Sequence, residues 1–248
     1  MTEEERRQAI QRRLSRIKEE RERSPIPTGF PTLDEALGIG GLPRGSIVEI
    51  YGPEGCGKTS LLLQIIAFVQ RHGGAAAFID AEHAFNTIDA KTLGVDLERM
   101  PLARPGSAEE ALAITSQLAA SCALDLIVVD SAAALVPQIE REVGIGEAGP
   151  SAQSRLLAGP FRRLAHAVMK TDACVVFLNQ SRYRPEVSGR DIETSASGFP
   201  LKLHAAVRIA VIPQETRIRL RVLKNKVGKP FREAPLSWKN GRGFVGGP

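Results

Sequence analysis

The most informative segment of the chain reads Gly52-Pro53-Glu54-Gly55-Cys56-Gly57-Lys58-Thr59-Ser60. It matches the pattern G-x-x-x-x-G-K-[ST] at every required position. In this pattern, glycines let backbone N–H groups curl around a phosphate, the lysine reaches the β- and γ-phosphates, and the hydroxyl binds Mg²⁺. The segment therefore predicts a nucleotide site with Lys58 on the phosphates and Thr59 on Mg²⁺. The alternative is a chance glycine-rich turn.

The residues on either side favour the nucleotide site. Residues 47–51 form a short β-type run, and residues 61–69 are apolar enough for a buried helix. A strand, a loop and a helix N-terminus are the setting that such a site needs, because the helix dipole adds to the attraction for anions.

Length and composition fit one globular domain, with 248 residues of which 43% are hydrophobic. No run approaches the roughly 20 apolar residues of a membrane span, and the N-terminus has no signal-peptide core. Cys56, Cys122 and Cys174 lack metal-binding spacing, and a disulfide at Cys56 would obstruct the phosphate loop. These features predict a cytoplasmic protein without a membrane partner.

Positive charge is concentrated toward the C-terminus. Residues 181–248 hold 14 Lys and Arg against 5 Asp and Glu, whereas the net charge of the whole chain is +5. A basic segment beside a predicted ATP site favours a polyanionic partner. A solvated basic surface is the alternative.

The chain divides into two parts. Residues 2–23 hold 8 Lys and Arg and 6 Asp and Glu, with three apolar residues at helical spacing, and prolines follow directly. We expect a charged helix over residues 1–24 and one ATPase core over residues 25–248.

Candidate strands and helices alternate along the core. The β-type runs are 47–51, 75–80, 124–130 and 173–179, and the helical segments are 60–72, 107–121 and 151–169. Ser107 and Glu110 form a capping box at the second helix. The alternation predicts an α/β fold with a mainly parallel sheet flanked by helices. Residues 205–212 and 216–223 predict a C-terminal antiparallel hairpin that closes the sheet.

Acidic residues follow two of these strands. Asp130 ends an apolar run, as does the aspartate that holds Mg²⁺ in phosphate-loop ATPases. Asp80 and Glu82 lie at the end of another strand, where a carboxylate could activate the attacking water. The alternative is that Asp80 and Glu82 cap the next helix.

Taken together, these motifs resemble the RecA recombinase family. The resemblance runs from about Thr28 to Phe231. It is carried by residues 36–45, 47–59, 78–84 and 124–135, and by Phe177-Leu178-Asn179-Gln180 and Leu223-Lys224-Asn225-Lys226. It implies a RecA-type phosphate-loop ATPase core that binds ATP and Mg²⁺.

The resemblance also implies residue roles. Glu82 matches the catalytic glutamate, Asp130 the Mg²⁺-binding aspartate and Gln180 the glutamine that senses the γ-phosphate, while Lys58 acts on the phosphates. Lys224 and Lys226 match lysines that reach the ATP of a neighbouring subunit. Because residues i and i+2 of a strand share one face, both could point at one phosphate. Ordinary surface lysines are the alternative.

Two segments, 138–149 and 181–199, correspond to the family's DNA-binding loops. The basic and aromatic residues in and beside them are Arg155, Arg162, Arg182, Tyr183, Arg184 and Arg190. Arginine suits phosphate contacts and tyrosine suits base stacking, so single-stranded DNA is the expected partner. Solvated loops are the alternative.

The chain also departs from the family pattern. The family's C-terminal domain is not expected here, and only residues 24–28 remain of a longer linker, so self-assembly stays open. Pro150 and Pro185 stand where the family has apolar wedges. Leu203 replaces an aromatic residue, and Asp89 replaces a tyrosine that stacks on adenine.

Two functions are compatible with this pattern. The departures favour an accessory protein of the DNA-damage (SOS) response that regulates RecA or a translesion polymerase complex, as in the ImuA-type paralogues. The intact Glu82, Gln180, Lys224 and Lys226 favour a DNA-stimulated ATPase recombinase that forms filaments on single strands. DNA repair and recombination are common to both, and a signalling ATPase of the same fold is less favoured.

Overall fold

The computed structural model describes residues 23–137, 150–185, 191–196 and 199–246. Within them, ten strands form one sheet in the order β10-β9-β8-β7-β1-β5-β4-β2-β3, with β6 paired to β5. The strands are β1 (Ser46–Gly52), β2 (Ala76–Asp80), β3 (Leu102–Ala103), β4 (Leu126–Asp130), β5 (Cys174–Pro185), β6 (Asp191–Ser195), β7 (Val207–Gln214), β8 (Arg217–Asn225), β9 (Glu233–Lys239) and β10 (Gly243–Gly246). The helices are α2 (Pro31–Leu37), α3 (Lys58–Arg71), α4 (Thr87–Thr92), α5 (Ala108–Ala120), η1 (Ala132–Ala134), α7 (Pro150–Val168) and α8 (Phe199–His204).

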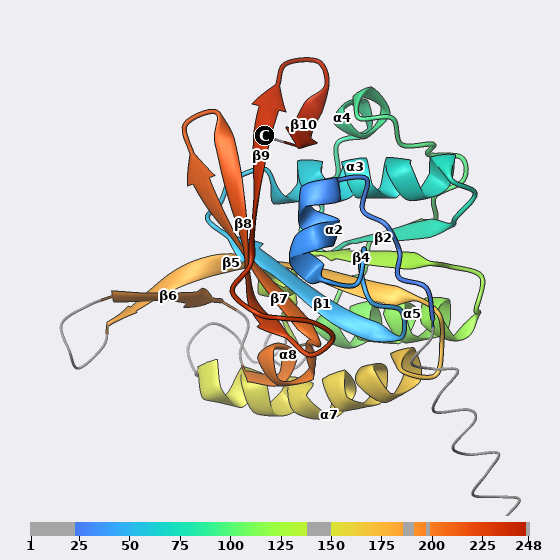
Figure 1. Cartoon of the computed structure of the whole chain (residues 1–248). Coiled ribbons are helices and arrows are strands. Elements are labelled where there is room, and N and C mark those ends of the chain that lie inside the picture. Colours follow the sequence, from blue (N-terminus) through green and yellow to red (C-terminus); the bar gives the residue numbers. More distant parts are fainter. Residues whose placement is uncertain (1–22, 138–149, 186–190, 197–198, 247–248) are drawn as a thin grey trace, which may run out of the picture.

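The centre of the sheet is parallel and covered on both faces, which confirms the predicted fold class (Figure 1). Strands β1, β5, β4 and β2 pair in parallel, and β7 joins β1 in parallel as well. Alternate strand residues point into two separate cores. One core packs against α2, α3 and α4, and the other against α5, α7 and α8. Because both faces are buried, these strands are almost continuously apolar.

The four predicted strands and three predicted helices of the core all form, with ends shifted by a few residues. Ser107 caps α5 through a hydrogen bond from the Glu110 N–H to its Oγ (3.2 Å). The returning bond of the capping box goes to the Gly106 N–H, which donates to Glu110 Oε2 (2.6 Å). The box therefore forms with its second bond displaced by one residue.

The antiparallel hairpin, β7 and β8, also forms, but the prediction that it closes the sheet is wrong. Strands β9 and β10 extend the sheet beyond it, all in antiparallel pairs. The β10 residue Phe244 packs its ring against Gly57 of the phosphate loop, so this extension supports the loop from the side. The sequence of β9 alternates buried Ala234 and Leu236 with exposed residues, but it contains Pro235, and a proline argues against a strand inside a sheet.

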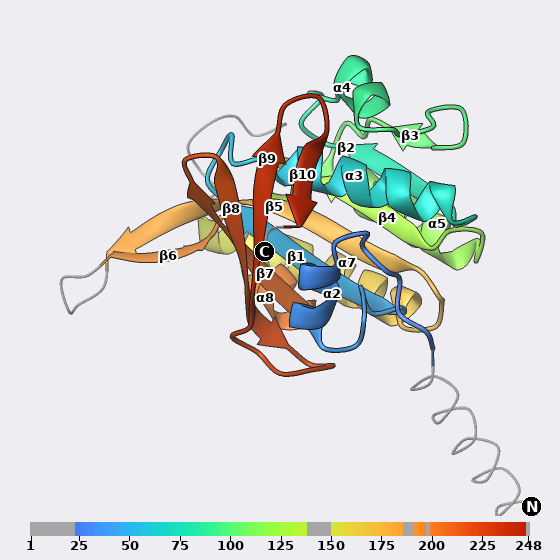
Figure 2. The same cartoon turned by 45° about the horizontal axis from the view of Figure 1, so that its top comes forward.

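The segment expected as a second long loop is partly a β-ribbon. Strand β5 continues past the sheet to Pro185 and pairs with β6, with Ser181 opposite Ser195. Figures 1 and 2 both show this ribbon projecting away from the body of the molecule. Of the expected N-terminal helix over residues 1–24, residues 1–22 lie outside the described residues, and residues 23 and 24 are not helical. The first loop, 138–149, also lies outside the described residues. No helix in the described part of the chain is long and apolar enough to cross a membrane.

Candidate nucleotide site

Strand register brings the predicted site residues to one edge of the sheet. Gly52 at the end of β1 lies opposite Gln180 on β5, and Asp80 at the end of β2 lies opposite Asp130 on β4. The carboxyl ends of parallel strands form the ligand crevice of open α/β sheets. The edge therefore collects one phosphate loop and three polar strand ends.

Two glycines of the loop are required by close contacts. Gly57 has φ 86°, and a Cβ there would lie 2.6 Å from the Phe244 ring. A Cβ on Gly52 would lie 2.6 Å from the carbonyl oxygen of Val211. Helix α3 begins directly after Gly57 with no side-chain cap on its first N–H groups. These N–H groups are the donors that an anion at a helix N-terminus uses.

Lys58 lies within the loop rather than in solvent, with 9% of its surface exposed. Its Nζ donates to the carbonyl oxygens of Gly52 (3.1 Å) and Pro53 (2.6 Å). The loop thus holds an ammonium group in its concavity. A phosphate placed there would meet a cation and the N–H groups of α3 together.

Thr59 and Asp130 meet at the edge. The Thr59 hydroxyl donates to Asp130 Oδ2 at 2.7 Å. The pKa of Asp130 is raised to about 6, chiefly by burial and also by the Glu82 and Asp80 charges, which together outweigh the lowering by the Thr59 hydrogen bond and by Lys58. Hydroxyl and carboxylate oxygens are ligands that Mg²⁺ prefers, and it commonly takes one or two protein ligands beside substrate phosphates. The described residues contain no cluster of three or more His, Cys, Asp or Glu for a metal held by protein alone.

Glu82 lies next to this pair. Its backbone N–H donates to the carbonyl oxygen of Asp130 (3.1 Å), and its Oε1 accepts a hydrogen bond from the Ser131 hydroxyl. Gln180 Nε2 approaches the same Oε1 at 3.5 Å, a long contact. The structure therefore brings Glu82, Asp130 and Gln180 together from three strand ends.

The helix-cap alternative for Asp80 and Glu82 is wrong. The N-cap of α4 is Asn86, whose Oδ1 accepts from the Ile88 N–H (2.9 Å). Asp80 is 1% exposed and accepts from the N–H groups of Ala84 and Phe85 and from Arg104 Nε (3.2 Å). Asp80 thus holds the turn after β2, which leaves Glu82 as the exposed acid of this segment.

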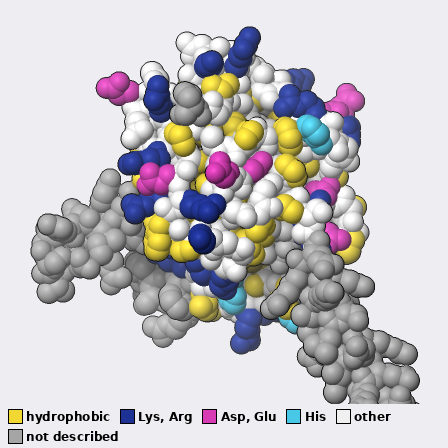
Figure 3. All heavy atoms as spheres, viewed as in Figure 1, with side chains coloured by type: hydrophobic (Ala, Val, Ile, Leu, Met, Phe, Trp, Pro, Cys, Tyr) yellow, Lys and Arg dark blue, Asp and Glu magenta, His cyan; other side chains and the backbone are white. Residues whose placement is uncertain are grey.

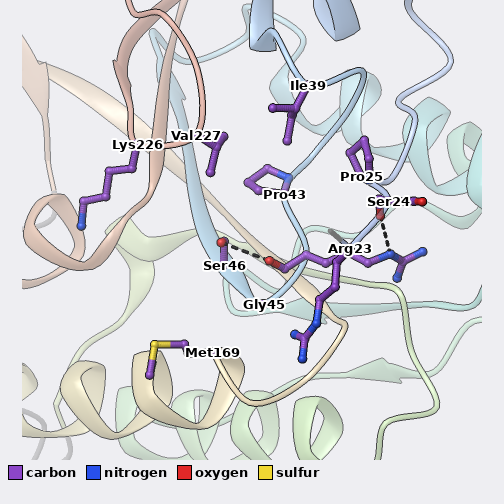
Figure 4. A pocket seen from close by; sticks show the side chains of 11 residues that line it. Arg23, Ser24, Pro25, Ile39, Pro43, Gly45, Ser46, Met169, Lys226 and Val227 are labelled. Atoms are coloured by element: carbon purple, nitrogen blue, oxygen red, sulfur yellow. Dashed lines mark hydrogen bonds between the residues drawn. The ribbon is translucent and has the colours of Figure 1, made fainter. Parts of the chain in front are cut away.

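Lys224 and Lys226 do not lie at the phosphate loop. The Lys226 N–H donates to Ala206 and the Ala206 N–H donates to Ile47, which places Lys226 at the start of β1. The loop follows the other end of this strand, about 20 Å away at roughly 3.3 Å per residue. Lys226 lines a pocket there, which Met169 and Ser46 also line (Figure 4).

Lys224 belongs to a cluster of cations. Its Nζ donates to the carbonyl oxygens of Lys202 (2.7 Å) and Leu203 (3.2 Å) at the end of α8. Burial lowers the pKa of Lys224, and the Lys226 and Arg208 charges lower it further. Burial also lowers the pKa of His204, with Lys226, Lys224 and Arg162 adding to the effect. We call the set Arg162, His204, Lys224 and Lys226 the basic cluster.

The predicted DNA-contacting residues are described to different extents. Arg182 is exposed on β5 and Arg162 is exposed on α7. For Tyr183 and Arg184 on β5, and for Arg155 on α7, the description covers the backbone. Arg190 lies outside the described residues. Figure 3 shows Lys and Arg side chains spread over this face of the molecule, with Asp and Glu side chains among them.

Sequence reasoning missed a polar network inside the sheet. Glu49, in the middle of β1, is fully buried. Its carboxylate accepts from Arg208 Nε (2.5 Å) and from Asn179 Nδ2 (2.8 Å). The available signal was a charged residue in the otherwise apolar run 47–51, which requires a buried partner. The partner itself, on a strand far away in sequence, had no local signature.

Strand, phosphate loop and helix, with acids at the ends of β4 and β2 along the same edge of the sheet, define the class of phosphate-loop nucleotide-binding proteins. Within this class, the chain belongs to the RecA family, since the family described as "RecA N-terminal domain" matches residues 7–245.

Curated relatives agree with this assignment. The chain is 44% identical over 229 residues to "Protein RecA" of Symbiobacterium thermophilum, which covers 88% of this chain and 65% of that protein. It is 46% identical over 229 residues to "Protein RecA" of Roseiflexus castenholzii, with the same coverage. It is 46% identical over 230 residues to "Protein RecA" of Thermus thermophilus, covering 88% of this chain and 68% of the relative. The chain spans about two thirds of the length of these relatives.

Proposed function

We propose that this RecA-family, ATP-binding chain is a DNA-stimulated ATPase that couples ATP to binding of single-stranded DNA. The observation that carries the proposal is the convergence of Glu82, Gln180 and the Thr59–Asp130 pair beside the phosphate loop. Identity of about 45% to proteins named RecA supports the same activity. In this proposal residues 25–248 act as one ATPase core in the cytoplasm, and residues 1–24 form a charged helix.

Each residue at the edge has a role in the proposal. ATP supplies the γ-phosphoryl group that is transferred to water. The N–H groups of Gly52–Ser60 and the ammonium of Lys58 bind the phosphates, while Thr59 and Asp130 hold Mg²⁺. Glu82 is exposed and hydrogen-bonded, so it can orient a water and accept its proton. Gln180 is placed to contact the γ-phosphate next to Glu82.

The DNA side of the proposal rests on the β5–β6 ribbon. The ribbon begins directly after Gln180 and carries Arg182, Tyr183 and Arg184 on β5. Arg162 on α7 adds a further exposed cation. Guanidinium groups suit phosphates and the tyrosine ring suits stacking on a base. A shift in the position of Gln180 would thus be transmitted along β5 to the proposed DNA-binding segment.

The basic cluster supports self-assembly in this proposal. Burial lowers the pKa values of Lys224 and His204, and repulsion from neighbouring cations lowers them further, so an added anion would be stabilised there. Lys226 lies about 20 Å from the chain's own phosphate loop, by the length of β1. The phosphates of a nucleotide on a second copy of the chain would match this cluster.

An accessory role, as regulator of RecA or of a translesion polymerase complex in the manner of ImuA-type paralogues, is the second candidate. Leu203 is 51% exposed at the end of α8. Asp89 lies in the first turn of α4, where its charge suits the helix N-terminus. Neither side chain supplies the aromatic ring that the family pattern has at its position.

The test is ATP turnover with and without single-stranded DNA, together with electron microscopy for filaments. DNA-stimulated turnover with filaments supports a recombinase, and ATP binding without filaments but with capture of RecA supports the accessory role. Equal ATP turnover with and without DNA would overturn the proposal and favour a signalling ATPase.

A further inference from the structure

A buried ion pair lies at the centre of the sheet and needs an explanation. Glu49 is 0% exposed, and its partner is the half-buried Arg208 on β7, with Nε 2.5 Å from Glu49 Oε2. Replacing such a pair by apolar side chains is often neutral or stabilising. The presence of the pair is thus weak evidence that it stabilises the fold. Its other contacts show which parts of the chain it holds in place.

Arg208 joins three elements. Its guanidinium lies 5.1 Å from the centre of the Tyr51 ring, one residue before the phosphate loop. Its Nη2 donates to the hydroxyl of Ser195 (3.2 Å), the last residue of β6 and hence the base of the ribbon. Ser195 is itself buried, so this bond is shielded from water.

The same carboxylate also holds the backbone of Gln180. Glu49 accepts from Asn179 Nδ2, and Asn179 Oδ1 accepts from the Gln180 N–H (2.9 Å). The carbonyl oxygen of Gln180 then accepts from the Ala196 N–H (2.8 Å), next to Ser195. The residue beside Glu82 and the base of the ribbon are therefore tied to one buried carboxylate by two routes.

We propose that Arg208 is a positioning residue that links the Gln180 end of the nucleotide site to the orientation of the β5–β6 ribbon. The inference rests on the proposed function, because the ribbon is there the DNA-binding segment. Glu49 fixes one side of the guanidinium, so the bond to Ser195 holds the ribbon in a defined place relative to β1. A lysine cannot make both contacts, since it lacks the planar fork of donors.

The test compares two hydroxyl deletions on the same ribbon. Ser195→Ala removes the acceptor of Arg208 and keeps the buried ion pair. Ser181→Ala is the matched control, because Ser181 lies directly opposite Ser195 and, among the described residues, takes no hydrogen bond from Arg208. The affinity for a fluorescent oligo(dT) is measured at fixed salt with and without ATP and Mg²⁺, and ATP affinity is measured separately.

The ratio of the two DNA affinities measures the coupling. We expect Ser195→Ala to reduce this ratio by about tenfold, the equivalent of one charge-assisted hydrogen bond, with ATP affinity unchanged. Ser181→Ala should keep the wild-type ratio. If the wild-type ratio differs from one and Ser195→Ala leaves it unchanged, the inference is overturned and the proposed function is left intact. A wild-type ratio of one overturns both.

Discussion

The nucleotide edge and the basic cluster carry opposite charges, but in both regions side chains of like charge lie close together. At the edge, Asp130 and Glu82 crowd together and burial raises the pKa of Asp130 to about 6. In the basic cluster, burial and neighbouring cations lower the pKa values of Lys224 and His204. A cation such as Mg²⁺ would lower the pKa of Asp130 at the edge, and an anion would raise the pKa values of Lys224 and His204 in the basic cluster.

The difference lies in how the two regions are built. The edge is formed by the ends of the parallel, apolar strands β1, β2, β4 and β5. The pairing of these strands therefore fixes where the site residues lie. The cluster is assembled from α7, α8 and the end of β8, which are distant in sequence. In the proposed function, the first region is a self-contained site, while the second is completed by the phosphates of a nucleotide on another copy of the chain.

The largest effect is expected from Glu82→Gln. The amide keeps the shape but accepts no proton, so ATP turnover should fall at least a hundredfold, the usual range for a lost general base. ATP affinity should stay near the wild-type value, since Lys58 and the loop N–H groups are intact. Steady-state turnover and nucleotide titration check this, with Glu215→Gln as the control. Normal turnover in Glu82→Gln would show that another group activates the water.

Lys58→Ala is expected to act on binding. It removes the cation held inside the loop, and we expect ATP affinity to fall about a hundredfold, equivalent to roughly 2.7 kcal/mol. Calorimetric titration of ATP measures this. Lys91→Ala, which removes an exposed lysine of α4, serves as the matched control. Equal affinities for the two variants would contradict the assignment of the loop.

Arg182→Ala should weaken binding to single-stranded DNA severalfold and lower the salt dependence. One lost phosphate contact reduces the slope of log K against log[salt] by about 0.7 for single strands. Anisotropy titrations at several salt concentrations provide the slope. Arg71→Ala, at the far end of α3, should keep both values. An unaltered slope in Arg182→Ala would place the DNA elsewhere.

The smallest expected effect is on His204. Lys226→Ala removes a neighbouring cation, so the His204 pKa should rise toward its ordinary value, because protonation then meets less repulsion. NMR titration of the imidazole protons measures it, with Lys239→Ala as control. An equal His204 pKa in the wild type and in Lys226→Ala would show that Lys226 does not belong to the basic cluster.

The sequence predicted the parallel half of the fold because its signals are local. The loop pattern, the apolar strands and the Ser107 cap each depend on neighbouring residues. The two outer strands β9 and β10 were missed, since Pro235 argues against a strand inside a sheet and β10 is held in place by packing on α3. There Gln64 accepts from the Phe244 N–H (2.7 Å).

For the site, the sequence predicted Thr59 beside Asp130, and the structure brings them together. The residues alone did not separate Asp80 from Glu82, because the two acids differ only in what the turn places around them, and the choice of Glu82 as the catalytic acid rested on the family resemblance. Sequence reasoning also missed Arg208, whose partner Glu49 lies 159 residues away. Contacts between residues so far apart in the sequence depend on the order of the strands in the sheet, which no motif encodes.

The most direct test of the account is hydrogen exchange of the ribbon with ATP and with ADP, without DNA. The Ala196 N–H donates to the carbonyl oxygen of Gln180, so it reports on both the nucleotide edge and the ribbon. If Gln180 links the γ-phosphate to the ribbon, exchange over residues 181–196 differs between ATP and ADP in Glu82→Gln, which keeps ATP intact. Identical exchange with the two nucleotides, at saturation, would contradict the link.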